Sequence, residues 1–201
     1  SAGSEILEML NKKSRHIVKY IFWISAAEFL VFLVLTILYI FQTDDNNSVI
    51  NIIERLGAKK TFEMEKNLAH LYFVMKVVSL LVTGIFAVKF YNSYRKIRVE
   101  ENLKKFILRI VNFRQTVNRF IMANFGLVIL FAVVICWFIY NEISMQQVQL
   151  NPQIIIGFVI TAIIMTGICI GLVWFYYRVV YGIMMKKLGK NLEQLKEIEN
   201  A

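Results

Sequence analysis

The chain has 201 residues, of which 58% are hydrophobic and 18% are charged, and it contains one proline. A soluble domain of this length carries about a quarter charged residues, so the composition excludes an ordinary soluble domain and indicates a membrane protein. The apolar excess also excludes a disordered chain, and two cysteines exclude a disulfide-stapled scaffold. The net charge of +9 therefore calls for a topological explanation before a nucleic-acid one.

Four apolar stretches are long enough to cross a membrane, because a hydrocarbon core about 30 Å thick needs about 20 helical residues. They cover approximately residues 17–41, 71–90, 120–140 and 154–180. Apolar side chains occur on all sides of each stretch without alternation, which excludes outer-membrane barrel strands. We therefore predict an all-α polytopic protein in which residues 1–201 form a single transmembrane domain, with four helices in an antiparallel bundle.

Lysine and arginine are distributed unevenly between the two sides that these spans define. Seventeen of them lie in the first 19 residues, between the second and third spans, or from Arg178 onward, whereas four lie in the first loop and none in the third. Because positively charged loops stay in the cytoplasm, we predict an inner-membrane protein with cytoplasmic N- and C-termini. The basic charge then reflects topology, and we expect no nucleic-acid partner.

The third helix is expected to begin well before the membrane. No glycine or proline occurs between Gly84 and Gly126, and apolar residues recur there at steps of three and four. A helix from about Glu101 to Tyr140 would be roughly 60 Å long, twice the hydrocarbon thickness. The apolar residues at these steps are Leu103, Phe106, Ile107, Ile110, Phe113 and Val117.

The other helix ends have their own signals. The first helix is expected to start as early as Ser4, acting as its N-cap, and the fourth to start at Pro152 after Asn151. The fourth continues in helix-compatible sequence beyond Val180 and is expected to resume after Gly189. The predicted bundle therefore extends into the cytoplasm.

The external loop from Gln42 to His70 contains a short amphipathic pattern. It indicates a helix that either lies on the outer membrane interface or, as we favour, caps the bundle as a connector. The apolar positions of this pattern are Val49, Ile50, Ile53 and Leu56.

The chain also contains matching segments at an offset of 83 residues. Thr83-Gly84-Ile85 matches Thr166-Gly167-Ile168, and Tyr94-Arg95 matches Tyr177-Arg178. Two hairpins related by an axis along the membrane normal would form a parallel repeat. The match is short, and the aromatic belt common to membrane helices also produces such similarity.

Glu28 lies near the middle of the first span, where a charge is costly and usually has a partner. The other ionisable residue well inside a span is Lys76, at a similar height when 1.5 Å is counted per residue. The structural interpretation is an ion pair with Lys76, or a carboxylic acid hydrogen-bonded to Asn124 or Thr161. The functional interpretation is a proton or cation site, and it predicts that Glu28→Gln stops transport.

Small residues mark candidate helix contacts. Gly167 and Gly171 form a GxxxG step in the fourth span, and Ser79 and Thr83 belong to a small-residue stripe in the second. Both patterns allow close backbone approach, either within the bundle or between two copies of the chain.

Basic residues gather at the predicted inner boundary. This basic rim is either a docking surface for acidic head groups or an acidic partner, or ordinary topogenic charge that snorkels to the interface. It comprises Arg15, Lys19, Arg95, Arg98, Arg114, Arg119 and Arg178.

Two segments carry a resemblance to known sequences. Lys12 to Tyr20, followed by Ser25 and Glu28-Phe29, resembles the start of a group of small bacterial four-span membrane proteins, and Tyr177 to Lys196 resembles their C-terminus. Related chains extend further at the N-terminus. The group has no established activity to carry over, although its members are often labelled as a beta-carotene monooxygenase.

That label implies iron held by several histidines, whereas this sequence has two, His16 and His70, predicted on opposite sides of the membrane. The sequence also lacks the motifs of zinc peptidases, serine hydrolases and P-loop enzymes. We therefore expect no metal, no cofactor and no catalysis. The expected function is a structural, regulatory or partner-binding module that acts through its cytoplasmic helical extensions, with a cytoplasmic protein or a second copy as partner. The alternative is a small proton-coupled transporter or channel that uses Glu28.

Overall fold

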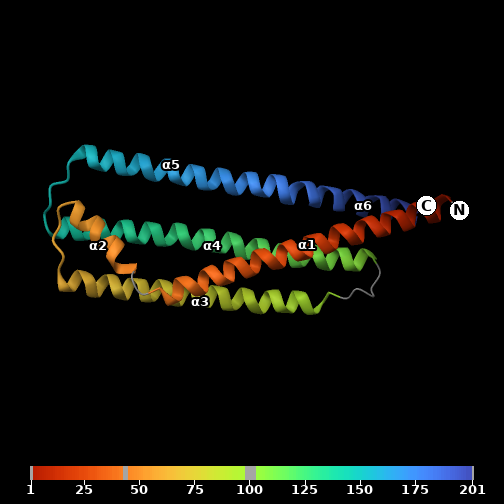
Figure 1. Ribbon diagram of the computed structural model, residues 1–201, viewed down its shortest axis with the longest axis horizontal. Helices are drawn as coiled ribbons and strands as arrows, with labels where there is room; N and C mark the ends of the chain where they lie inside the picture. The colour runs from red at the N-terminus through yellow and green to blue at the C-terminus, as the bar shows by residue number, and fades with distance from the viewer. Residues whose placement is uncertain (1, 43–44, 98–102, 201) are drawn as a thin grey trace. The chain divides into compact units, whose positions relative to one another are not determined.

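The computed structural model describes residues 2–42, 45–97 and 103–200, and this part of the chain contains helices and no strand, which confirms the all-α class. Figure 1 shows the helices in chain order. They are α1 (Ala2–Phe41), α2 (Asp45–Arg55), α3 (Phe62–Arg95), α4 (Leu103–Met145), α5 (Pro152–Tyr176), the π-helical turn η1 (Tyr177–Gly182) and α6 (Ile183–Asn200).

Within the described residues, four helical segments are long and apolar enough to cross a membrane. With 40 residues in α1 and 43 in α4, these two helices are about 60 Å and 65 Å long at 1.5 Å per residue. Both are about twice the length that a hydrocarbon core requires. The four segments are Ser4–Phe41, Phe62–Arg95, Lys104–Met145 and Pro152–Val179.

The helix ends agree with the sequence only in part. Pro152 begins α5 as predicted, and the side-chain Oδ1 of Asn151 accepts a hydrogen bond from the backbone N–H of Gln153 at 3.1 Å. Ser4 is not an N-cap, because α1 already begins at Ala2 and continues through it. Gly189 does not interrupt α6, since one glycine within a helix costs only about 1 kcal/mol. The predicted start of the third helix at Glu101 lies outside the described residues.

The chain divides into two compact units. Unit 1 comprises Ser1–Glu28, Lys89–Val117 and Val159–Ala201, and unit 2 comprises Phe29–Val88 and Asn118–Phe158. Segments of α1, α3, α4 and α5 contribute to both units, whereas α2 belongs to unit 2 and α6 to unit 1.

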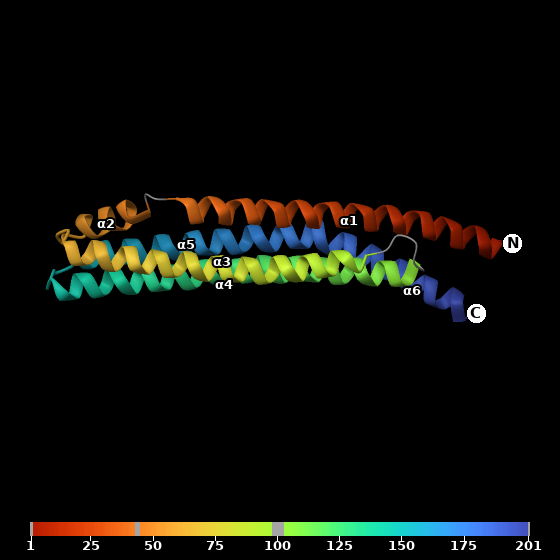
Figure 2. The same cartoon turned by 90° about the horizontal axis from the view of Figure 1, so that it is seen from below.

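The main apolar core of unit 2 lies where α2 packs against α3 and α4 (Figures 1 and 2). The amphipathic helix predicted between Gln42 and His70 is confirmed, and its apolar face is buried by protein. It therefore acts as a connector that caps unit 2. The buried residues of this core include Val49, Ile50, Ile53, Met64, Leu68, Phe138 and Ile143.

Backbone and side-chain hydrogen bonds hold the turn that follows α2. Gly57 has φ +99°, the left-handed conformation that glycine adopts without a steric penalty. The side-chain amide of Gln146 accepts from the backbone N–H of Lys59 at 2.8 Å and donates to its carbonyl oxygen at 2.9 Å. Next to it, Lys60 forms a 2.7 Å ion pair with Glu65, and this hydrogen-bonded carboxylate raises the pKa of Lys60.

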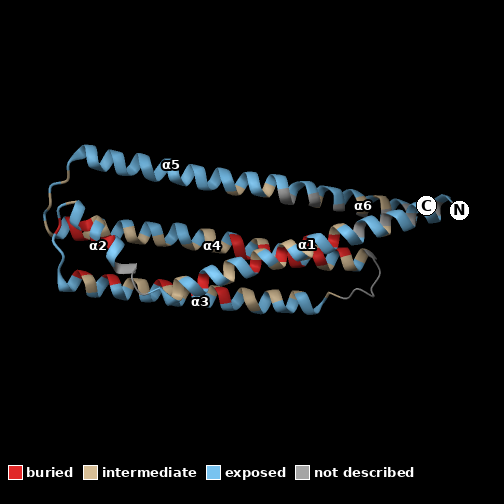
Figure 3. Cartoon of the chain, in the orientation of Figure 1, coloured by how far each residue is buried: buried red, intermediate tan, exposed pale blue. Residues whose placement is uncertain are grey.

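The core of unit 1 is a seam between α1 and α4, visible in Figure 3 as red on both helices. Of the apolar steps predicted before the third span, those from Phe106 to Val117 face this seam, because residues three or four apart share one side of a helix. The side chain of Leu103 lies outside the described part of the structure. By contrast, no residue of α5 is buried, and the helix is pale blue along most of its length in Figure 3. The buried residues of the seam include Val18, Ile21, Ile107, Ile110, Phe113 and Val117.

Candidate functional site

A polar network interrupts the apolar seam of unit 1. Ser25 and Glu28 are three residues apart on α1 and therefore lie on the same face, one turn beyond the buried Ile21. Arg114 lies between Ile110 and Val117 on the buried stripe of α4. The helical period of each helix thus places a polar group where an apolar one would continue the core.

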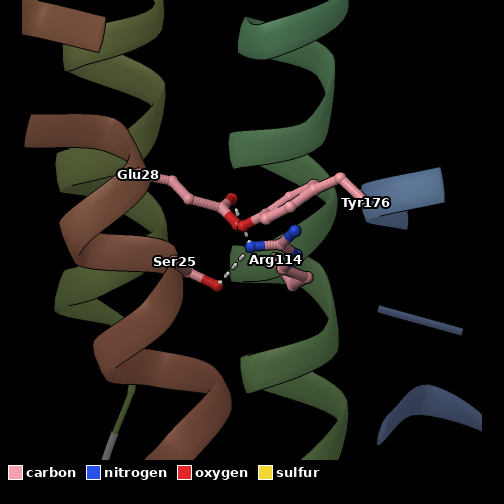
Figure 4. A network of polar contacts seen from close by, with 4 residues as sticks. All are labelled: Ser25, Glu28, Arg114 and Tyr176. Atoms are coloured by element: carbon pink, nitrogen blue, oxygen red, sulfur yellow. Dashed lines mark hydrogen bonds and ion pairs between the residues drawn. The ribbon is translucent and has the colours of Figure 1, made fainter. Parts of the chain in front are cut away.

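Glu28 is held by two side chains from other helices (Figure 4). The Nη1 of Arg114 donates to Oε2 of Glu28 at 2.5 Å and also to Oγ of Ser25 at 3.2 Å. The hydroxyl of Tyr176 on α5 donates to Oε1 of Glu28. The polar network, defined as Ser25, Glu28, Arg114 and Tyr176, therefore ties α1 to α4 and α5 within unit 1.

The ion pair of the polar network is largely closed to solvent. The side chain of Arg114 is 2% exposed and that of Glu28 12% exposed, and Ser25 is fully buried. An isolated charge in such a place is very costly, whereas a paired and hydrogen-bonded one is tolerated. The carboxylate thus has its charge matched and both oxygens occupied, which suits a fixed cross-link between helices.

Aromatic side chains pack together next to the polar network. Phe113, next to Arg114 on α4, stacks on Phe22 of α1 with ring centroids 5.2 Å apart and contacts Phe90 of α3 at 4.6 Å. Offset aromatic pairs of this kind add about 1 kcal/mol each beyond the area they bury. They connect α3 to the seam between α1 and α4.

A π-helical turn begins directly after Tyr176. It spans Tyr177–Gly182 and joins α5 to α6 without a break in the helix. Such turns insert an extra residue and therefore rotate the side chains that follow. The side chains of α6 therefore point in different directions from those they would have if α5 continued as a regular α-helix.

The ion-pair partner of Glu28 is not Lys76, the residue that the sequence suggested. Lys76 of α3 donates through Nζ to the backbone carbonyl oxygen of Gln42 at 2.5 Å, and Asn124 donates to the carbonyl of Phe120 in its own helix at 2.8 Å. The ion-pair partner is instead Arg114. The reason is that heights counted separately along each helix do not fix which faces meet.

The two small-residue patterns differ in their surroundings. Ser79 and Thr83 are buried on α3, as expected for a packed helix face. Gly167 and Gly171 are exposed, and a Cβ added at either would meet no heavy atom within 4 Å. The GxxxG step therefore makes no close helix contact with the parts of the chain that the structure describes.

Among the residues of the predicted basic rim that the structure describes, all except Arg114 are exposed. Arg114 belongs to the buried polar network, so its assignment to the rim was wrong. Its position gives the signal that could have found it, since it lies four residues after Ile110 and three before Val117 on the apolar stripe. Arg98 lies outside the described residues. The exposed members are Arg15, Lys19, Arg95, Arg119 and Arg178.

A second candidate site in unit 1 is a basic groove of about 840 Å³ between α1 and the segment formed by η1 and α6. Its basic side chains come from both walls, and no acidic residue lines it among those the structure describes. Ile17, Val179 and Ile183 form its apolar part. The polar residues of the basic groove are Lys13, His16, Tyr20, Lys187, Lys190, Asn191 and Gln194.

A search of the described residues for metal sites found no group of three or more His, Cys, Asp and Glu side chains. Comparison with curated proteins returned no match, and comparison with solved structures returned none either. A family model described as a domain of unknown function (DUF8845) matches residues 4–200, which is nearly the whole sequence. The chain therefore belongs to this family of domains of unknown function.

Proposed function

We propose that the protein is a non-enzymatic, multi-pass protein of the inner membrane that binds an acidic segment of a cytoplasmic partner protein in its basic groove. In this proposal the four spans form an antiparallel bundle, and both termini lie in the cytoplasm. Seventeen of the 23 Lys and Arg residues then lie on the cytoplasmic side, as positively charged segments do.

The observation that carries the proposal is the composition of the basic groove. Lys13 faces it from α1, and Lys187 and Lys190 face it from α6, so cations line both walls. The described lining residues include no acid to neutralise them, and Ile17 and Ile183 add apolar surface. Such a groove suits a segment that presents acidic side chains beside apolar ones, because complementary charge steers encounter and fixes register.

The polar network supports this role by fixing the groove walls. Tyr176 is the last residue of α5 before the π-helical turn, and its hydrogen bond to Glu28 ties that end of α5 to α1. These two helices continue into the opposite walls of the basic groove. A site held open before binding saves the cost of ordering it on association.

The test is site-specific photo-crosslinking in native membranes. A photoreactive residue at Gln194, which lines the groove, is expected to give a defined crosslinked product, whereas the same residue at the exposed Lys196, on the opposite face of α6, gives none. A product of twice the chain mass identifies a second copy as the partner; any other mass identifies a different protein.

Charge reversal makes this test specific to the groove. Lys187→Glu with Lys190→Glu is expected to lower the crosslinking yield at Gln194 about tenfold or more, because reversing the charge of a lysine in the groove weakens its attraction for an acidic segment. The matched control is Lys186→Glu with Lys196→Glu, which makes the same charge change at exposed positions of α6 outside the groove. Equal yields at Gln194 and Lys196, or equal losses in the two double variants, contradict the proposal.

A further inference from the structure

A second cavity in unit 1 lies against a different face of the same stretch of α1 that lines the basic groove. It has a volume of about 610 Å³ and is lined by α1, by the end of α3 with the following Ile97, and by the first half of α4. None of its lining residues also lines the basic groove. We name it the amphipathic cavity, and its key residues are Arg15, Lys19, Phe22, Trp23, Arg95 and Ile110.

Three cations surround the amphipathic cavity. Arg15 and Lys19 lie one turn apart on α1, and Arg95 ends α3. All three are exposed, and the described lining includes no acidic residue. The Nε of Arg15 donates to Oδ1 of Asn11 at 3.0 Å, and the Arg95 guanidinium carbon lies 5.8 Å from the ring centroid of Tyr91. The cavity thus has excess positive charge for an anion.

The wall beyond these cations is apolar and aromatic. Ile110 of α4 forms part of the floor and is 1% exposed, and Phe22 of α1 also lines the cavity. Trp23 lines the cavity but is 63% exposed, so a large ring projects outward from the same helix. Tryptophan prefers the boundary between water and lipid, where one part of its ring is apolar and its N–H stays polar.

We propose that the amphipathic cavity holds an anionic phospholipid of the inner leaflet. Its phosphate lies among Arg15, Lys19 and Arg95, and an acyl chain follows Phe22 and Trp23 along α1. Basic cavities between membrane helices on the cytoplasmic side bind anionic head groups in this way. Free phosphate would use the cations alone and leave the aromatic wall uncovered, so the combination favours a lipid.

The test uses Trp23 as a built-in reporter. The protein has three tryptophans, and Trp137→Phe with Trp174→Phe leaves Trp23 as the only one. This variant is reconstituted into vesicles with phosphatidylglycerol or phosphatidylcholine brominated on the acyl chains, which quench tryptophan on contact. We expect phosphatidylglycerol to quench Trp23 at a several-fold lower mole fraction than phosphatidylcholine.

Neutralising the cations identifies what causes this preference. Arg15→Gln, Lys19→Gln and Arg95→Gln together are expected to abolish the several-fold preference, because one cation beside an anionic leaflet is worth about 1 kcal/mol, or about fivefold. The matched control replaces Lys105, Lys186 and Lys196 by Gln, which are exposed and outside the cavity, and it keeps the preference. A variant that retains only Trp137, on the part of α4 in unit 2, shows none.

The outcomes separate a lipid site from other sources of the same chemistry. Equal quenching of Trp23 by the two lipids in the protein with its cations intact overturns the proposal without requiring any substitution at the cavity. A preference that survives neutralisation of the three cations also overturns it. A preference abolished by millimolar inorganic phosphate assigns the cations to a soluble anion instead of a lipid.

Discussion

Replacement of Arg114 by methionine is expected to lower the free energy of unfolding by about 3–5 kcal/mol. Removing one partner of a buried ion pair leaves the other charge without compensation, which is among the most costly single changes in a protein. The side chain of Glu28 is 12% exposed, so solvent screens its uncompensated carboxylate only weakly. The shift can be measured as the unfolding midpoint of the purified protein in detergent on addition of a denaturing surfactant.

Two further variants make this result specific to the ion pair. Arg119→Met removes the same charge five residues along α4 from an exposed position and should change stability by less than about 0.5 kcal/mol. Arg114→Met combined with Glu28→Leu removes both charges and should recover most of the loss, because the uncompensated carboxylate is gone. If Arg114→Met is no more damaging than Arg119→Met, the polar network does not hold the helices together.

Replacement of Phe120 by alanine is also expected to cost about 3–5 kcal/mol of unfolding free energy, as Phe→Ala changes in packed cores do. Phe120 is fully buried in unit 2, and its ring lies 5.0 Å from that of Phe29 and 5.5 Å from that of Phe86. Its loss leaves a cavity between α1, α3 and α4 within this unit. The same surfactant titration gives the magnitude.

The matched control for Phe120 is Phe73→Ala on α3. Phe73 is 66% exposed, and it belongs to the same unit, so the chemical change is equal but little protein contact is lost. We expect its unfolding midpoint to stay close to that of the unsubstituted protein. Similar losses at Phe120 and Phe73 would show that aromatic packing does not organise unit 2.

The helices could be predicted because they depend on local properties of the sequence. Length and apolarity identified the four segments that could span a membrane, and the three- and four-residue steps identified the buried face of α4. The spacing of Val49, Ile50 and Ile53 likewise predicted the buried side of α2. In each case one helix alone carries the signal.

The polar network could be predicted only in part, because it depends on how three helices meet. The position of Glu28 showed that it needed a partner, but counting 1.5 Å per residue gave Lys76 instead of Arg114. Such counts start from span boundaries that sequence fixes only within a few residues. The contribution of Tyr176 gave no sequence signal, since aromatic residues are common near the ends of spans.

Three predictions, namely a contact between two copies, the two-hairpin repeat and transport, are not tested by the contacts within this chain. The GxxxG step at Gly167 and Gly171 faces open space, so its interpretation as a contact between two copies stays a prediction. The same holds for the two-hairpin repeat and for transport through Glu28. Sequence pattern alone does not identify what covers a face or what crosses a membrane.

The measurement that tests the central claim most directly is the membrane sidedness of the basic groove. Cys136 and Cys169 are free and exposed, so both are first replaced by alanine. Single cysteines then replace Lys190, which lines the groove, and the exposed Gln147, which follows α4. A membrane-impermeant thiol reagent is applied to right-side-out and inverted vesicles. Our account predicts that position 190 reacts only from the cytoplasmic side and position 147 only from the outside. Labelling of position 190 from the outside would contradict both the cytoplasmic partner and the inner-leaflet lipid.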